Sequence, residues 1–309
     1  MTIKKSRITD EVGDPRPIWI EEFRKNGYAA IDWLCDYYEK IESYPVLSKV
    51  KPGQVQSGLS PSPPTNGEPF SQIMKDLDEV ILPGITHWQS PGFFGYFPAN
   101  ASPPSVLGEI FSAGLGVQGM LWLTSPSCTE LEISILDWIV EMLDLPSMYK
   151  SSGAGGGVIQ DSASSAVLCA VIAAREVAQN GEASEKGTDS RLIGYCSEEA
   201  HSSVEKAFAI AGIGRENLRK IPTDSEGSLS DPILKERIAL DSSAGLLPFF
   251  ICGTVGSTSR LSRDPIRDLG LIARSNNCWL HVDSAMAGTA TVCPEFRYLN
   301  DGIELANSY

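Results

Sequence analysis

The sequence predicts an α/β fold in which helices cover a mostly parallel sheet. Three apolar segments of strand length, at 191–196, 246–252 and 279–282, alternate with segments of helix length. The segment at 279–282 is the clearest strand, and it ends in an acid and a turn of small residues. Strands that alternate with helices are typical of parallel sheets, because parallel neighbours need a long crossover connection.

The N-terminal part differs in composition from the rest. We expect residues 1–95 to form a helical arm, with helices from residue 17 to about 45 and over 70–82. Five prolines lie between residues 51 and 69, which predicts a loop or linker rather than an element. Because this arm has few apolar residues for a core of its own, we expect it to pack on the main domain or on a second subunit.

Residues 96–309 are expected to form the large α/β domain. A helix at 130–145 needs a cap from Thr129 or a nearby serine. Asp264 and Pro265 are expected to begin another helix, as its cap and its first residue. In all, five helices are predicted in this domain, over 104–115, 130–145, 162–179, 202–211 and 265–275.

Composition excludes several classes of partner. The net charge of −14 argues against nucleic acids and anionic membranes, and no apolar run is long enough to span a bilayer. The seven cysteines are dispersed without a C-x-x-C pair, which is typical of thiols in a reducing compartment. With three histidines and no Cys/His cluster, a metal site is not expected. We therefore expect a cytoplasmic protein without bound metal.

Four features are candidates for chemistry, and each has a structural alternative. Asp283 ends a strand, where α/β folds bind ligands, and a carboxylate there needs a cationic partner. A glycine-rich segment at 151–157 precedes the 162–179 helix, whose start favours an anion, unless it is only a flexible connection. His201 begins a helix and is either structural or suited to stacking on a ring. Thr258 lies in a turn after the 246–252 strand, which is either a ligand contact or a simple tight turn.

Taken together, these features indicate one ligand. A phosphate site, a stacking histidine and an acid for a pyridinium nitrogen are what pyridoxal phosphate requires. The aromatic segment 87–100 predicts a loop that lines the core, with an apolar wall for an aromatic ligand as the alternative. A dinucleotide site is not supported, because the glycines lack the G-x-G-x-x-G register after a strand.

Seven motifs connect the chain to a known family. They are FFGYFP at 93–98, SPSCTELE at 125–132, GGGVIQ at 155–160, HSSVEK at 201–206, AGLLPFF at 244–250, HVD at 281–283 and CPEFR at 293–297. With them, the chain from about Trp19 to its last residue resembles the pyridoxal-phosphate decarboxylases of aromatic L-amino acids. That family includes tyrosine and tryptophan decarboxylases and the plant aromatic aldehyde synthases, and the Pro-rich insert favours the plant branch.

The resemblance implies a fold-type I enzyme that works as a homodimer, with the N-terminal arm wrapped around its partner. It implies catalytic roles for two residues, since Asp283 would pair with the pyridine nitrogen and His201 would stack on the ring and contact the substrate. The other positions that the resemblance implies are Ala163 and Ser164 for the phosphate, Thr258 and Ala285 beside the cofactor, and Tyr96, Phe97 and Pro98 in the substrate pocket.

The chain also departs from the family pattern. Asp161 stands where Gly, Ser, Thr or Asn is usual, and Ser165 where Glu is usual. The resemblance places the Schiff-base lysine and the C-terminal small domain after Tyr309, so we expect the 309-residue chain alone to lack appreciable decarboxylase activity. The functions that remain open are decarboxylation of tyrosine, tryptophan, dihydroxyphenylalanine or phenylalanine, aldehyde synthesis, and an inactive or fragmentary homologue that serves at most as a dimer partner.

Overall fold

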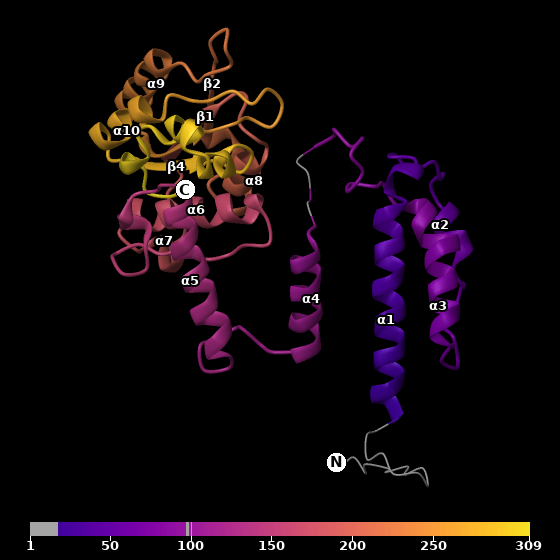
Figure 1. The fold of residues 1–309 in the computed structure, drawn as a ribbon. Coiled ribbons are helices and arrows are strands. Elements are labelled where there is room, and N and C mark those ends of the chain that lie inside the picture. The colour runs from indigo at the N-terminus through magenta and orange to yellow at the C-terminus, as the bar shows by residue number, and fades with distance from the viewer. Residues whose placement is uncertain (1–17, 97–98, 100) are drawn as a thin grey trace. The chain divides into compact units, whose positions relative to one another are not determined.

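The computed structural model describes residues 18–96, 99 and 101–309, and the chain divides into two compact units, Met1–Phe111 and Ser112–Tyr309. Figure 1 shows helices alone at the N-terminal end and a sheet with helices at the C-terminal end. The functional division drawn after residue 95, into an arm and a cofactor-binding domain, stays a prediction. The helix α4 contains the boundary between the two units and runs over Pro103–Leu115.

The first unit is helical in its described part. Its α-helices are α1 (Ile18–Glu39), α2 (Gln54–Gly58) and α3 (Phe70–Asp76), and α3 continues through a π-helical turn, Leu77–Ile81. The expectation of a loop throughout 51–69 is wrong at α2. This short helix packs Val55 so closely on Gly84 that a Cβ at Gly84 would lie 2.7 Å from the valine Cγ2. Such a tertiary contact is not visible in the local sequence.

Partly buried aromatic side chains pack around a buried histidine in this unit. His87 is buried, and a 2.9 Å hydrogen bond joins its Nδ1 to the hydroxyl of Tyr37. Tyr44 stacks on the imidazole with 4.9 Å between ring centroids, and Trp33 stacks on Tyr37. Burial lowers the pKa of His87, so the ring is held neutral between the tyrosines.

The second unit contains a four-stranded parallel sheet in the order β2-β1-β3-β4. The predicted α/β class is therefore confirmed. The strands are β1 (Leu192–Ser197), β2 (Leu218–Ile221), β3 (Leu247–Thr254) and β4 (Trp279–Asp283). The helices are α5 (Pro126–Met142), α6 (Ala163–Ala178), α7 (Ala183–Lys186), α8 (Ser203–Ile210), α9 (Asp231–Ser243) and α10 (Ile266–Ser275). Three 3-10 segments follow β4, at Gly288–Val292, Pro294–Asn300 and Ile303–Leu305.

Each face of the sheet carries its own core, because side chains alternate between faces along a strand. On one face, Ile193, Ile251 and Leu280 pack in a cluster that includes residues of α9 and α10. On the other, Cys252 and Phe250 pack in a cluster that includes residues of α6 and α8. β1 and most of β3 are thus buried on both sides, as their continuous apolar runs predict.

Several elements differ from the sequence prediction. β2, α7 and α9 are absent from that prediction. α5 begins at residue 126 rather than 130, because Ser125 caps it by accepting from the Cys128 N–H. Asp264 does not cap α10, so that expectation is wrong. Its carboxylate instead accepts the backbone N–H groups of Thr254 and Leu229, each at 2.8 Å, and burial raises its pKa to about 6.

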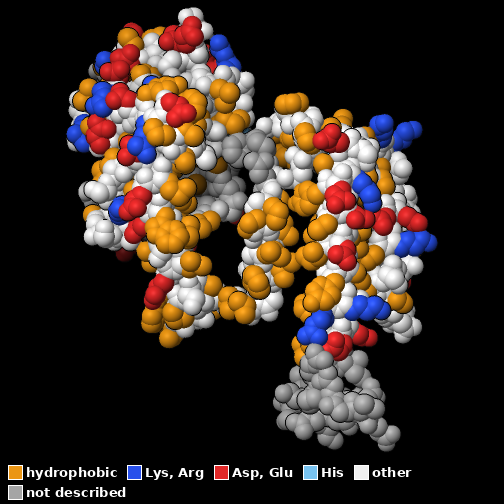
Figure 2. All heavy atoms as spheres, in the orientation of Figure 1, with side chains coloured by type: hydrophobic (Ala, Val, Ile, Leu, Met, Phe, Trp, Pro, Cys, Tyr) orange, Lys and Arg blue, Asp and Glu red, His pale blue; other side chains and the backbone are white. Residues whose placement is uncertain are grey.

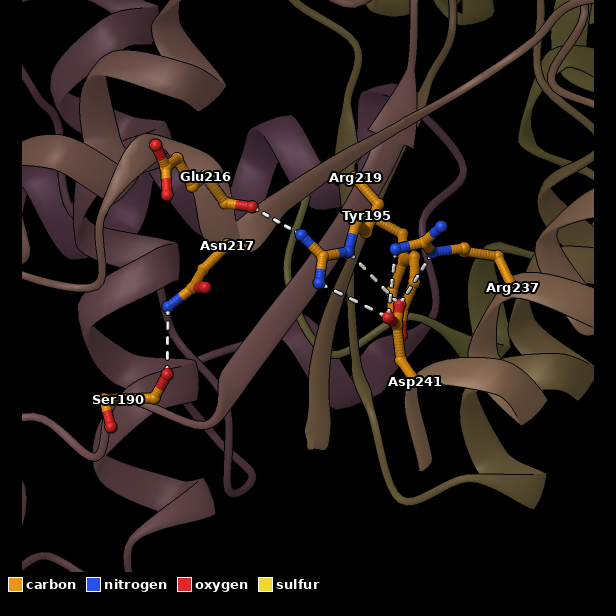
Figure 3. A network of polar contacts seen from close by, with 7 residues as sticks. All are labelled: Ser190, Tyr195, Glu216, Asn217, Arg219, Arg237 and Asp241. Atoms are coloured by element: carbon orange, nitrogen blue, oxygen red, sulfur yellow. Dashed lines mark hydrogen bonds and ion pairs between the residues drawn. The ribbon is translucent and has the colours of Figure 1, made fainter. Parts of the chain in front are cut away.

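A buried ion network joins α9 to two strands (Figure 3). The carboxylate of Asp241, 4% exposed, accepts the Tyr195 hydroxyl at 3.1 Å from β1. Arg219 of β2 and Arg237 of α9 also donate to it, at 3.3–3.4 Å and 3.1–3.2 Å respectively. Burial alone would raise the pKa of Asp241, but these hydrogen bonds outweigh it and the pKa lies below the usual value.

Candidate active site

The carboxyl ends of the strands define one edge of the sheet, where four segments meet. β1 leads to His201 at the start of α8, β3 leads to the turn with Thr258, and β4 ends in Asp283. The last residues of α6, such as Ala178, line a hollow together with the first residues of β1 and β4. α6 therefore runs antiparallel to the strands. The N-terminus of α6 therefore points toward the same edge as the strand ends.

Asp283 is half-buried on the face of the sheet that α6 and α8 cover. Val282 and Leu280 belong to the opposite core, so alternation places Asp283 and His281 on this face. One carboxylate oxygen, Oδ1, accepts the Ala285 N–H at 3.1 Å. Within the described residues, no Lys, Arg or His forms an ion pair with Asp283. The carboxylate is thus available to a cationic ligand.

The start of α6 leaves two donors free. Ser162 and Ser165 form a capping box, in which each hydroxyl accepts the other residue's backbone N–H. The described residues provide no acceptor for the N–H groups of Ala163 and Ser164, and both residues are exposed. Two free N–H groups at the positive end of a helix suit a phosphate. Asp161 opposes this, because its carboxylate accepts the Ser165 hydroxyl beside the same turn.

His201 lies just before α8 and is held by Ser203, the first residue of that helix. Its Nδ1 accepts the Ser203 N–H at 3.2 Å and contacts the Ser203 hydroxyl at 2.9 Å. Because a backbone N–H can only donate, Nδ1 carries the lone pair and the neutral ring is protonated at Nε2. Ser203 is buried while His201 is exposed, so the ring is held at one end and open at the other. This arrangement suits stacking better than proton acceptance at Nδ1.

Two loops at this edge pack against each other. Gly256, with φ of 84°, begins the turn that carries Thr258, and its Cβ would lie 2.6 Å from the Ala287 Cβ. The turn is closed by a hydrogen bond between the hydroxyls of Ser257 and Ser262 at 2.7 Å. The approach at Gly256 brings the Thr258 turn next to the segment after β4 that carries Ala285. Both Thr258 and Ala285 are exposed at this edge.

The predicted substrate residues belong to the other unit. Tyr96 is 86% exposed, has a positive φ of 54° and stacks on Trp88 with 5.9 Å between centroids. Phe97 and Pro98 lie outside the described residues. The roles of all three in a substrate pocket stay predictions.

Sequence reasoning missed three polar side chains at or beside this edge. Thr254 and Asp264 are not among the predicted site residues, and neither is His281. Burial lowers the pKa of His281 to about 4, against the opposing effect of the Asp283 charge, so its ring is neutral. The Ser308 hydroxyl contacts its Nδ1 at 2.8 Å and accepts the Trp279 indole N–H at 2.8 Å. An alternating pattern of apolar and polar residues at 279–283 was the available signal.

The residues present fit pyridoxal phosphate at its two ends. The Asp283 carboxylate forms no ion pair with a cationic side chain among the described residues. Ala163 and Ser164 offer free N–H groups at the same edge. His201 presents an exposed ring, whereas Asp161 carries a charge that disfavours a phosphate. No group of three or more His, Cys, Asp or Glu suited to a metal ion occurs in the part of the chain that the structure describes.

The profile of the family described as "Pyridoxal-dependent decarboxylase conserved domain" matches residues 52–309. The chain belongs to this pyridoxal-dependent decarboxylase family. Phenylacetaldehyde synthase of Arabidopsis thaliana is 47% identical over 95% of this chain, and tyrosine decarboxylase 2 of Narcissus pseudonarcissus is 45% identical over 95%. Family membership makes pyridoxal phosphate the cofactor of the lineage, in agreement with the free groups at this edge.

Solved structures of family members share the fold. The structure of Catharanthus roseus tryptophan decarboxylase in complex with L-tryptophan matches 94% of this chain, with a TM-score of 0.88 and 42% identity. That of Oryza sativa TDC with PLP and tryptamine also matches 94%, with a TM-score of 0.89 and 39% identity. The chain spans 59–60% of the two sequence relatives and 60–62% of the two solved chains.

Proposed function

We propose that this chain provides the cofactor-binding part of a pyridoxal-phosphate-dependent decarboxylase that acts on an aromatic L-amino acid and releases its amine. The observation that carries the proposal is the half-buried Asp283 carboxylate, which has no cationic partner within the described residues and lies at the same edge as the α6 N-terminus. Relatives named as tyrosine and tryptophan decarboxylases support the aromatic substrate class.

Each residue would contribute by binding or orientation. When bound, pyridoxal phosphate supplies an aromatic ring that accepts the electrons left when carbon dioxide departs. Asp283 would keep the ring nitrogen protonated, because a nearby carboxylate favours the charged form. The N–H groups of Ala163 and Ser164 would hold the phosphate, Thr258 and Ala285 would line the ring, and His201 would cover one of its faces. Tyr96, Phe97 and Pro98 would line the substrate pocket.

A binding experiment tests the proposal directly. Pyridoxal phosphate is titrated into the 309-residue chain, and bound cofactor is measured by equilibrium dialysis and by quenching of tryptophan fluorescence. A hydrogen bond to a charged group contributes about 1.5–3 kcal/mol, so Asp283→Asn should weaken binding roughly ten- to hundredfold. Asp268→Asn is the matched control, because Asp268 is an exposed acid in the first turn of α10 on the opposite face of the sheet. Equal affinity of all three proteins would contradict the proposal.

Aldehyde synthesis is the second candidate activity. The specific observation is that phenylacetaldehyde synthases of Arabidopsis thaliana and Petunia hybrida are 47% and 45% identical to this chain, as similar as the decarboxylases. The products distinguish the two. A decarboxylase yields the amine and carbon dioxide, whereas an aldehyde synthase also consumes oxygen and water and yields an aldehyde, carbon dioxide, ammonia and hydrogen peroxide. The assay uses a chain extended to include the Schiff-base lysine, because the 309-residue chain alone is expected to lack appreciable activity. Measuring amine and peroxide from the same incubation of that chain with an aromatic amino acid decides between them.

A second copy of the chain is the proposed partner. Apolar side chains gather along α5 on the surface (Figure 2), and Leu131, Trp138 and Met142 are each more than half exposed. An exposed apolar stripe of this kind is typical of a subunit interface. No helix in the described part of the chain is long and apolar enough to cross a membrane. A cytoplasmic location is proposed from the seven cysteines, of which none forms a disulfide in the structure.

A further inference from the structure

The hydroxyl of Thr254 is buried without a hydrogen-bond partner. Thr254 ends β3, and the residue is 6% exposed. No donor or acceptor in the described part of the chain reaches its Oγ1. Burying a hydroxyl without a partner destabilises a fold, so a hydroxyl retained at such a position needs a reason. A valine would fill nearly the same space without this cost.

Thr254 lies opposite Asp283 in the sheet, with its side chain on the same face. The two residues are register partners on the neighbouring strands β3 and β4, and adjacent strands lie about 4.8 Å apart. A Cβ at Gly253 would contact Ile266 and Leu269 of the α10 core, so alternation directs Thr254 to the opposite face. That is the face on which Asp283 lies. The two side chains therefore share one face at one edge of the sheet.

The Asp264 carboxylate near Thr254 binds two backbone N–H groups and not the Thr254 hydroxyl. The Asp264 carboxylate accepts the Thr254 N–H through Oδ2 and the Leu229 N–H through Oδ1. Asp283 uses only Oδ1, which accepts the Ala285 N–H, and Oδ2 has no hydrogen-bond partner among the described residues. The backbone of Thr254 is fixed by the sheet and by Asp264. Rotation of its side chain is thus the movement by which the hydroxyl would approach Asp283.

We propose that Thr254 is a positioning residue for Asp283. Its hydroxyl donates to the Asp283 carboxylate when a protonated ring nitrogen is bound there, and together with the Ala285 N–H it holds the carboxylate in the orientation that the cation needs. The inference rests on the proposed function, since it assigns a role toward the same cofactor. It also explains the orphaned hydroxyl, which is unfavourable in the unliganded chain and satisfied in the liganded one.

The test separates a cofactor role from a structural role. Thr254→Val and Thr254→Ser are compared with the wild-type chain in thermal unfolding and in equilibrium dialysis with pyridoxal phosphate. Thr254→Val should unfold at or above the wild-type midpoint, because it removes an unpaired buried hydroxyl, yet bind the cofactor roughly three- to tenfold more weakly. Thr254→Ser should bind within about twofold of the wild type, because it keeps the donor.

Thr291→Val is the matched control. Thr291 is also buried, but its hydroxyl is paired, since its one proton is donated to the Gly288 carbonyl at 2.8 Å and the Leu143 carbonyl lies within reach at 3.2 Å. This variant should lose stability and keep its cofactor affinity. Wild-type affinity of Thr254→Val, or a loss of stability equal to that of Thr291→Val, would overturn the inference. If the wild type binds the cofactor and Asp283→Asn weakens this binding while Thr254→Val does not, only the role of Thr254 fails. If the wild type does not bind the cofactor, the proposed function fails as well.

Discussion

Replacing Asp241 with asparagine tests whether the buried ion network holds α9 to the sheet. The variant keeps the size of the side chain but removes the charge that Arg219 and Arg237 share. The side chain of Arg219 is 23% exposed and also donates to the Glu216 carbonyl, so its charge would be left largely buried without an anionic partner. Breaking a buried pair costs about 3–5 kcal/mol. The side chain of Arg237 is 42% exposed, so solvent screens its contribution to at most about 1 kcal/mol.

The amide oxygen that replaces the carboxylate in this variant still accepts one of these hydrogen bonds, for instance from Tyr195. We therefore expect Asp241→Asn to lower the free energy of unfolding by about 2–4 kcal/mol. For a domain of this size, that corresponds to a fall of the thermal midpoint by roughly 5–15 °C. Urea unfolding followed by circular dichroism measures the change. Arg237→Gln removes the more exposed partner of Asp241, so it should lower the free energy of unfolding by less than about 1 kcal/mol.

The same network predicts a dependence on pH. The hydrogen bonds hold the folded-state pKa of Asp241 below its unfolded value, so its contribution is present above about pH 4 and is lost as the pH falls through the folded pKa. The difference in stability between the wild type and Asp241→Asn should therefore narrow below about pH 4. A variant within about 1 kcal/mol of the wild type at neutral pH, or Arg237→Gln as costly as Asp241→Asn, would refute the reasoning.

Three further outcomes are expected. Gly194→Ala should destabilise the chain by about 1–3 kcal/mol in urea unfolding, because its Cβ would overlap the Phe208 ring; an unchanged midpoint would show that the ring can move aside. Asp161→Asn should tighten pyridoxal phosphate binding about three- to tenfold by removing a like charge, while unphosphorylated pyridoxal, the control ligand, should bind equally to both proteins. Trp138→Glu should convert a dimer to a monomer in analytical ultracentrifugation, and a variant that sediments as the wild type would exclude α5 from the interface.

The elements that can be predicted from the sequence are those whose signal is local. β4 and the Ala-rich α6 are recognisable because a short, mainly apolar segment that ends in an acid, and a serine before a long helix, are visible in the chain itself. The missed strand, β2, has only two apolar residues in Leu-Arg-Lys-Ile and lies at the edge of the sheet. α9 does carry a signal, namely Asp-Pro at its start followed by Leu234 and Ile238 four residues apart on its buried side, so its omission is an error of interpretation.

The candidate site was predictable in part for the same reason. Asp283 and His201 follow recognisable strand and helix boundaries, and the family motifs add their expected roles. Thr254 and Asp264 could not be assigned in this way, because the relevant facts are an absent hydrogen bond and a carboxylate that reaches backbone groups on two other segments. Such facts depend on the register of neighbouring strands, which a single sequence does not provide.

The capping box of α6 has a consequence for the thermodynamics of ligand binding. Because Ser162 and Ser165 satisfy each other, the first turn of α6 is ordered before any anion arrives. When a phosphate binds the N–H groups of Ala163 and Ser164, the chain therefore loses little conformational entropy, because this turn is already ordered. Calorimetry of inorganic phosphate binding should accordingly give a heat-capacity change close to zero, without the large negative value that accompanies folding coupled to binding. The helix start is a rigid receptor rather than a segment that its ligand must fold.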